Sequence, residues 1–237
     1  MRVTIGAVSD ANRWIVVVPV KVASAGKTRL AGAFDARART ALVRAMALDT
    51  VDATAAAARV ARVLVVTADP VLIEAAGPAF GVVEEPVQGA PAPDVGPTLG
   101  AGYELISPLN RAIGEGVAAA RRLVPRPSIA VVLGDVPALR PADLDAALER
   151  AEEVSRGFVA DAGGSGTTLL TGSRGAELSP RFGVGSAAAH ATCGHVPLDV
   201  PSSSTLRRDV DVPDDLEAVA ALGLGRRTAV LLERLRG

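Results

Sequence analysis

Short, continuously apolar segments recur along the chain and alternate with segments of helical periodicity. Residues 14–20 are apolar throughout, as expected of a strand that is covered on both faces. Residues 35–58 instead carry apolar side chains at helical spacing. Repeated alternation of this kind predicts a single α/β domain, with an open, mostly parallel sheet and helices on both faces. We expect strands at 14–20, 63–66, 80–83, 129–133, 157–160 and 167–170, and helices at 35–58, 70–76, 109–123, 141–151, 187–190 and 226–236, with one more beginning near Pro213.

The composition narrows the class of protein. The 237 residues carry a formal net charge of -1, so the chain lacks the basic excess that binding to nucleic-acid phosphates requires. Its one cysteine, Cys193, excludes an internal disulfide framework and a cysteine-based zinc cluster. No apolar run reaches the roughly 18 residues of a membrane-spanning helix, and residues 1–12 lack the pattern of a secretory signal. We therefore expect a cytoplasmic protein with a flexible N-terminus at 1–12, one domain at 13–237, and neither a nucleic-acid nor a membrane partner. A homodimer is left open.

Three cations follow the first predicted strand. In open α/β sheets ligands bind beyond the carboxyl ends of the strands, so segment 19–30 is a natural place for a site. Lys21, Lys27 and Arg29 stand there among small residues, which let a backbone approach phosphates while the cations neutralise them. The triplet at 26–28 does not complete a P-loop, because Lys21 occupies the position of that motif's first glycine. The alternative is a basic surface loop.

Acidic residues follow at two further places. Asp135 comes directly after a buried strand, and a carboxylate that faces bound phosphates is a natural Mg²⁺ ligand. Asp209 and Asp211 alternate, so on an extended backbone they share one face and can supply a second acidic ligand. The alternatives are a turn cap for Asp135 and simple helix-start acidity, which explains Asp214 and Asp215 better than it explains Asp209.

Two glycine-rich segments, 161–168 and 180–187, place glycines beside hydroxyl side chains. Exposed backbone N–H groups and hydroxyls of this kind can cradle an anion. Ser186 stands where it can cap the short helix that follows, and a helix start is itself an anion site. Two ordinary glycine turns with a capping serine remain the alternative. For His190 and His195 we favour surface or core roles over metal binding.

Together these segments resemble one enzyme family. The chain is similar to the guanylyltransferases that act on phosphoenolpyruvate or 2-phospho-L-lactate in coenzyme F-420 biosynthesis. The resemblance implies the fold of nucleotide-diphospho-sugar transferases, a Rossmann-like sheet, and transfer of GMP from GTP to the acceptor. It is carried, in order, by Lys-Thr-Arg-Leu at 27–30, Gly-Asp-Val-Pro-Ala-Leu at 134–139, Gly-Ser-Gly-Thr at 164–167, Pro-Arg-Phe-Gly at 180–183 and Asp-Val-Asp-Val-Pro at 209–213.

The resemblance also implies roles for individual residues. It implies Mg²⁺ as the cofactor and GTP with phosphoenolpyruvate as the substrates. The implied groups are Lys27, Arg29 and Asp135 for catalysis, Lys21, Lys27 and Asn110 for the nucleotide, Thr167, Gly183 and Ser186 for the acceptor, and Asp135 and Asp209 for the metal.

One segment departs from the family pattern. Residues 88–106 are longer and richer in glycine and proline than the resemblance implies, which predicts a lid or an altered nucleotide pocket and leaves base selectivity open. The acceptor is also open. The composition, rich in alanine, arginine and valine, suggests a bacterial source, and the resemblance implies that bacterial members of the family favour phosphoenolpyruvate over 2-phospho-L-lactate. A transferase of the same fold with another acceptor, and a non-catalytic nucleotide-binding protein, are the remaining alternatives.

Overall fold

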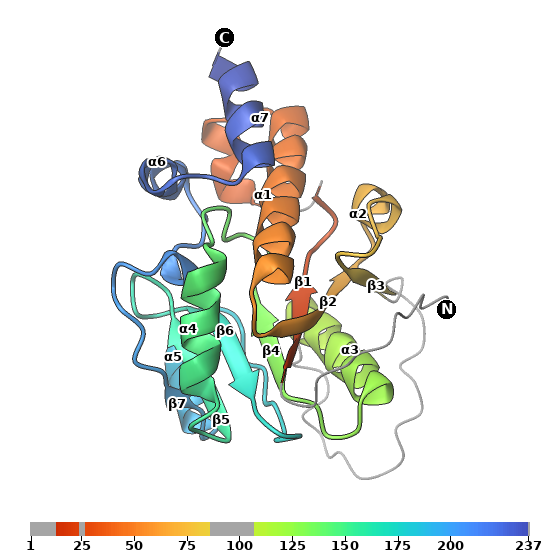
Figure 1. Cartoon of the computed structure of the whole chain (residues 1–237). Helices are drawn as coiled ribbons and strands as arrows, with labels where there is room; N and C mark the ends of the chain where they lie inside the picture. Colours follow the sequence, from red (N-terminus) through yellow and green to blue (C-terminus); the bar gives the residue numbers. More distant parts are fainter. Residues whose placement is uncertain (1–12, 24–26, 86–106, 237) are drawn as a thin grey trace.

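The computed structural model describes residues 13–23, 27–85 and 107–236, which form one seven-stranded sheet in the order β3-β2-β1-β4-β6-β5-β7 (Figure 1). β6 pairs antiparallel with β4 and β5, whereas the other paired strands run parallel. The predicted mostly parallel sheet is therefore confirmed. The strands are β1 (Trp14–Pro19), β2 (Val60–Thr67), β3 (Gly81–Glu84), β4 (Ile129–Val132), β5 (Arg156–Ala160), β6 (Thr167–Gly172) and β7 (Val196–Pro197).

Helices cover both faces of the sheet, as the apolar strands require. β1 is buried along its whole length, and its side chains alternate between two apolar clusters. One cluster joins β1 to α1 (Ala36–Ala56), α2 (Pro70–Glu74) and α4 (Pro141–Ala151). The other joins it to α3 (Pro108–Leu123) and α5 (Ser186–Thr192) on the opposite face. A strand with both faces buried has no polar side to alternate with, which is why its sequence is continuously apolar.

A third apolar cluster ties the C-terminal helices to the segment that follows β1. It joins α1 to α6 (Pro213–Leu222), to α7 (Arg226–Arg236) and to the short 3-10 helix η2 (Thr28–Gly32) through the fully buried Leu30. Asp49 of α1 is buried and accepts hydrogen bonds from the backbone N–H groups of Arg227 (3.1 Å) and Thr228 (2.7 Å). It therefore caps the start of α7 from a distant part of the chain. Figure 1 shows α7 lying beside the upper half of α1.

The start of α5 corrects one expectation. Ser186 was expected to be the N-cap, but the cap position belongs to Gly185, and Ser186 is the first helical residue. Gly185 has a φ of 71°, a left-handed conformation that glycine adopts without the steric cost that a Cβ brings. Ser186 is thereby turned inward and buried instead of bridging the helix start.

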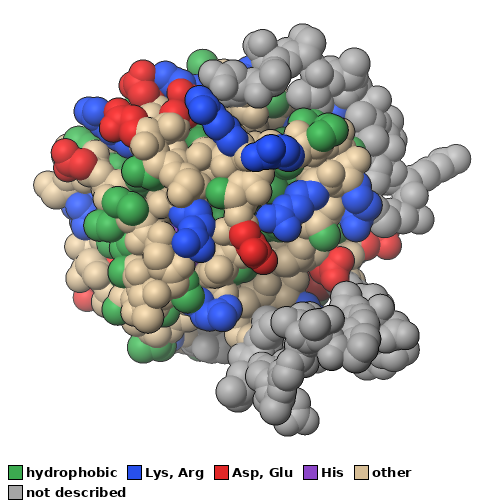
Figure 2. Space-filling model, turned by 90° about the horizontal axis from the view of Figure 1, so that it is seen from below, with side chains coloured by type: hydrophobic (Ala, Val, Ile, Leu, Met, Phe, Trp, Pro, Cys, Tyr) green, Lys and Arg blue, Asp and Glu red, His purple; other side chains and the backbone are tan. Residues whose placement is uncertain are grey.

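The remaining predicted elements lie within a few residues of their expected bounds. The predicted flexible segment 1–12 and the Gly/Pro-rich segment 88–106 lie outside the described residues. None of the described helices combines the length and the apolar character needed to cross a membrane. On the face of the molecule seen from below, basic, acidic and hydrophobic side chains lie interspersed with other polar side chains and backbone (Figure 2).

Candidate active site

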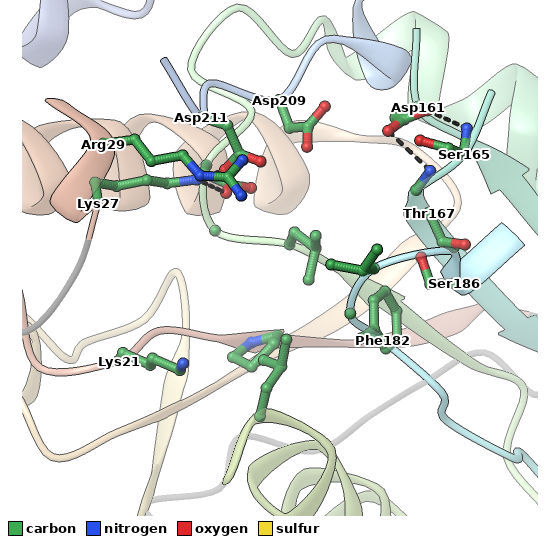
Figure 3. Close-up of a pocket in the computed structure, with 18 of the residues that line it drawn as sticks. Lys21, Lys27, Arg29, Asp161, Ser165, Thr167, Phe182, Ser186, Asp209 and Asp211 are labelled. Atoms are coloured by element: carbon green, nitrogen blue, oxygen red, sulfur yellow. Dashed lines mark hydrogen bonds and ion pairs between the residues drawn. The ribbon is translucent and has the colours of Figure 1, made fainter. Parts of the chain in front are cut away.

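A cavity of about 670 Å³ opens at the edge of the sheet where β1 and β4 end. β6 runs against its neighbours, so its first residue, Thr167, lies at this same edge. The cavity is lined by residues from all five of the segments that the sequence singled out (Figure 3). The structure thus gathers at one place groups that are as far apart in the sequence as Lys21 and Asp211.

Three carboxylates converge on one side of the cavity. Asp135, Asp209 and Asp211 each offer an oxygen within 4.8 Å of the other two. Val210, between the two later acids, is fully buried, and its N–H donates to the carbonyl oxygen of Asp135 at 3.0 Å. This anchoring directs the flanking acids toward Asp135, as their alternation on an extended backbone suggested. Asp211 was not among the expected metal ligands, although the same alternation pointed to it.

The acidic cluster can hold a divalent cation. The Oδ1 atom of Asp135 is buried and has no hydrogen-bond partner among the described residues, which leaves it available as a ligand. Burial, together with the charges of Asp135 and Asp211, raises the pKa of Asp209 to about 7. A divalent cation bound by oxygen ligands would relieve both the unsatisfied oxygen and the mutual repulsion.

Lys27 contacts this cluster directly. Its Nζ donates to Asp135 Oδ2 and, at 2.6 Å, to Asp211 Oδ1. Burial alone would lower the pKa of Lys27, but the charges and hydrogen bonds of the two aspartates raise it above its ordinary value. Lys27 therefore stays protonated and acts as a fixed positive charge. Its backbone has a φ of 51°, a strained conformation for a residue with a Cβ, which is typical of functional positions.

Lys21 and Arg29 supply further positive charge. Both are exposed and line the cavity. Figure 3 shows Arg29 beside Lys27 and the acidic cluster, whereas Lys21 lies across the cavity from them. The two cations can therefore contact different parts of an extended polyanion.

Asp69 anchors the segment that carries these cations. Its buried carboxylate accepts from the backbone N–H of Ala23 at 3.1 Å and from Arg44 Nε at 3.0 Å. Burial alone would raise its pKa, but hydrogen bonds from Ala23, Arg44 and Val71 lower it below the ordinary value. Sequence reasoning missed this role. The signal was an aspartate directly before Pro70 at the end of a buried strand.

The opposite wall of the cavity carries the residues expected to hold the acceptor. Thr167 and Ser186 are buried, and Gly183 is exposed at the cavity surface. Asp161 shapes the turn before Thr167, because its carboxylate accepts from the backbone N–H groups of Ser165 (3.0 Å) and Gly166 (2.9 Å). Asp161 lies in the predicted segment 161–168, but the sequence pattern indicated no role for it.

Asn110 lies behind this wall and is not among the described residues that line the cavity. Its Nδ2 donates to the carbonyl oxygen of Phe182 at 3.1 Å, and its Oδ1 accepts from the N–H of Phe182 at 2.9 Å. Ser107 Oγ accepts a further bond from Nδ2. The amide thus fixes the backbone of Phe182, and the expected role of Asn110 near the nucleotide stays a prediction.

Comparisons with known proteins find named relatives and solved structures of similar fold. No family model matches the chain. A phosphoenolpyruvate guanylyltransferase of Sanguibacter keddieii is 49% identical, over 93% of this chain and 84% of the relative. Proteins of the same name from Thermomonospora curvata (44% identical, 94% of this chain, 90% of the relative) and Streptosporangium roseum (40%, 97% and 95%) are also similar.

Solved structures show the same fold. A protein described as a nucleotide-diphospho-sugar transferase from Desulfovibrio desulfuricans superposes with a TM-score of 0.65 at 13% identity, over 93% of this chain and 94% of the other. 4-Diphosphocytidyl-2C-methyl-D-erythritol synthase superposes with a TM-score of 0.53 at 14% identity, over 89% and 99%. The expected nucleotide-diphospho-sugar transferase fold is confirmed.

Proposed function

Because the chain belongs to the family of phosphoenolpyruvate guanylyltransferases, we propose that it transfers GMP from GTP to phosphoenolpyruvate. The products are enolpyruvoyl-2-diphospho-5'-guanosine and pyrophosphate. The observation that carries the proposal is the meeting, in one cavity, of fixed cations, an acidic cluster and a wall of hydroxyl and glycine residues. The family resemblance implies that this reaction belongs to coenzyme F-420 biosynthesis.

The reaction joins two anions. A phosphate oxygen of phosphoenolpyruvate forms a bond to the α-phosphorus of GTP. The bond from that phosphorus to the oxygen bridging the β-phosphate breaks, and pyrophosphate leaves with the electron pair. The nucleophile is already ionised, so no general base is required and repulsion between like charges is the main barrier. The protein therefore has to position the reactants and compensate their charge.

Asp135, Asp209 and Asp211 are the residues that would hold Mg²⁺. When bound, Mg²⁺ would offset the repulsion between the reacting phosphate groups. The three aspartates fit this role through the unsatisfied Oδ1 of Asp135 and the short distances between their oxygens. Lys27 orders two of the carboxylates through its hydrogen bonds to Asp135 and Asp211.

The positions of the three cations suggest which part of the nucleotide each one binds. Lys27 and Arg29, on the side of the acidic cluster, stabilise the charge that develops on the departing pyrophosphate. Lys21, across the cavity, binds another part of the nucleotide. Thr167, Ser186 and the backbone at Gly183 hold the carboxylate or phosphate of the acceptor with hydroxyl and N–H donors.

Product identification tests the proposal. Purified protein is incubated with GTP, Mg²⁺ and phosphoenolpyruvate, and the products are identified by mass spectrometry. We expect GMP joined to phosphoenolpyruvate, with one pyrophosphate released for each product. Parallel reactions with 2-phospho-L-lactate, and with CTP or ATP in place of GTP, report acceptor and base selectivity. Product from another acceptor alone would assign the chain to a different transferase of this fold, and no nucleotidyl product with any acceptor would contradict catalysis.

A further inference from the structure

We propose that His190 is a positioning residue, which orients the hydroxyl of Thr167 as a hydrogen-bond donor toward the acceptor. The inference rests on the proposed function, since it concerns the acceptor half of the same cavity. His190 is fully buried in α5, one helical turn after Ser186, so both side chains lie on the same face of that helix. Its ring is not among the residues that line the cavity.

Two hydrogen bonds fix the tautomer of the ring. The backbone N–H of Arg181 donates to His190 Nε2 at 2.9 Å. A ring nitrogen that accepts cannot carry a proton, so in the neutral imidazole the proton is on Nδ1. Nδ1 lies 2.9 Å from Thr167 Oγ1, and with this tautomer Nδ1–H donates to that oxygen.

The surroundings keep the ring neutral. Burial, followed by the neighbouring charges of His195 and Arg181, lowers the pKa of His190 to about 4. A second proton would also place an N–H on Nε2, directly against the N–H of Arg181. Both effects favour the same tautomer across the neutral pH range.

The bond from His190 determines where the hydroxyl hydrogen of Thr167 can point. Its oxygen already accepts from His190, so its own hydrogen must point elsewhere, and no group in the described part of the chain accepts it. Thr167 lines the cavity. Its O–H is therefore left to donate to an anion there. Without His190 the hydroxyl would be free to rotate and to offer lone pairs to that anion.

The same ring holds the other side of the acceptor wall. The ring of Phe182 packs edge-on against His190, with centroids 5.0 Å apart. The Arg181 N–H bond fixes the residue just before Phe182, and this loop leads to Gly183. His190 thus joins the start of β6 to the loop that leads into α5.

A double-mutant cycle tests the inference. Thr167→Val removes the hydroxyl and keeps the shape of the side chain, and His190→Phe removes both ring nitrogens. Each single variant is expected to raise the KM for phosphoenolpyruvate about tenfold or more, the size of a lost hydrogen bond to a charged group. The KM for GTP is expected to stay within about twofold. In the Thr167→Val background, His190→Phe is expected to raise the KM by a smaller factor than it does alone, because the hydroxyl is already gone and only the bond from the N–H of Arg181 remains to be lost.

His195→Phe is the matched control. His195 is the other of the two histidines, is equally buried and packs against His190. Its Nε2 accepts from the N–H of Ser179, and within the described part of the chain its ring has no hydrogen bond to a residue that lines the cavity. It is expected to leave the KM for phosphoenolpyruvate unchanged. Fully multiplied effects of Thr167→Val and His190→Phe, or a KM change of equal size in His195→Phe, would overturn the positioning role without contradicting the proposed guanylyltransferase activity.

A measurement on the unaltered protein covers the case in which His190→Phe does not fold. Nitrogen-15 chemical shifts of the two imidazoles distinguish the tautomers, and His195→Phe assigns the signals. We expect the Nδ1–H tautomer for His190 at pH 7. An Nε2–H tautomer or a cationic ring would overturn the inference whether or not any acceptor is turned over. Wild-type protein without product would contradict the proposed function instead.

Discussion

At the scale of single residues, repulsion among three carboxylates sets the behaviour of the site. The effect of this repulsion is clearest at Asp209, because burial and the two negative neighbours raise the pKa of Asp209 to about 7. Its contribution to the stability of the cation-free protein is fully present below the unfolded pKa and is lost as the pH rises through about 7. Only the ionised form is a good ligand for a cation.

Mg²⁺ binding should therefore depend on pH. Between pH 6 and 7 the cation has to displace a proton from Asp209, so affinity is expected to rise with pH and to level off above about 7. Titration calorimetry at pH 6, 7 and 8 in buffers of different ionisation enthalpy measures both the affinity and the proton released. Asp209→Asn should remove this pH dependence. An affinity that is constant from pH 6 to 8 in the unaltered protein would contradict the assignment.

Asp135→Asn tests the acidic cluster at a buried oxygen that has no hydrogen-bond partner among the described residues. The substitution keeps the shape of the side chain but removes the charge that faces the reacting phosphates, so we expect turnover to fall about 100-fold or more. Circular dichroism melting checks that the fold is retained. Asp214→Asn, at an exposed acid in the first turn of α6, is the control and should keep normal turnover. Near-normal activity of Asp135→Asn would show that the cluster is not catalytic.

Which residues meet could be predicted in part. Asp135 and Asp209 follow from the position of strand ends and from alternation, because both depend on local geometry. The bond between His190 and Thr167 could not be predicted, since it depends on how α5 packs against the sheet. Asn110 bonds to Phe182, 72 residues away, for the same reason. Ser186 was misplaced because the path of the loop gives the cap position to Gly185.

At the scale of elements, the ends of helices connect distant parts of the chain. Asp49 in the middle of α1 caps α7, and Gly225 leaves room for it, because a Cβ there would lie 2.3 Å from the Asp49 carboxyl carbon. The bounds of α4 and α7 were predicted to the residue, since proline and charge mark the ends of these helices. The contact between α1 and α7 carries no such local signal.

Asp49→Ala should destabilise the protein without affecting the cavity. Loss of the cap leaves buried N–H groups without an acceptor, so we expect the free energy of unfolding to fall by about 1–2 kcal/mol. Urea denaturation measures this change. Asp52→Ala removes the neighbouring, more exposed ion pair to Arg227 and should cost less than about 1 kcal/mol. Equal effects of the two variants would argue against the capping role.

At the scale of the whole molecule, burial of two histidines makes the fold sensitive to acid. Burial lowers the pKa of both His190 and His195. A lowered histidine pKa contributes stability above the unfolded value of 6.5, and this contribution is lost as the pH falls toward about 4.

The melting temperature should therefore fall between pH 6.5 and pH 4.5. His190→Phe cannot take up the proton, so its melting temperature is expected to fall less steeply over this range than that of the unaltered protein. Differential scanning calorimetry at half-unit pH steps gives both slopes. Parallel slopes would mean that other groups control acid unfolding.

The two sides of the cavity come from different parts of the sequence, and β6, which runs against its neighbours, brings one of them to this edge of the sheet. The cations and carboxylates come from segments scattered between residues 21 and 211, whereas the residues assigned to the acceptor, and the histidine behind them, all lie between 161 and 190. Under the proposed assignment, one continuous segment of the chain determines which acceptor is preferred. Exchanging this one stretch between relatives would retarget the enzyme while its nucleotide machinery stayed untouched.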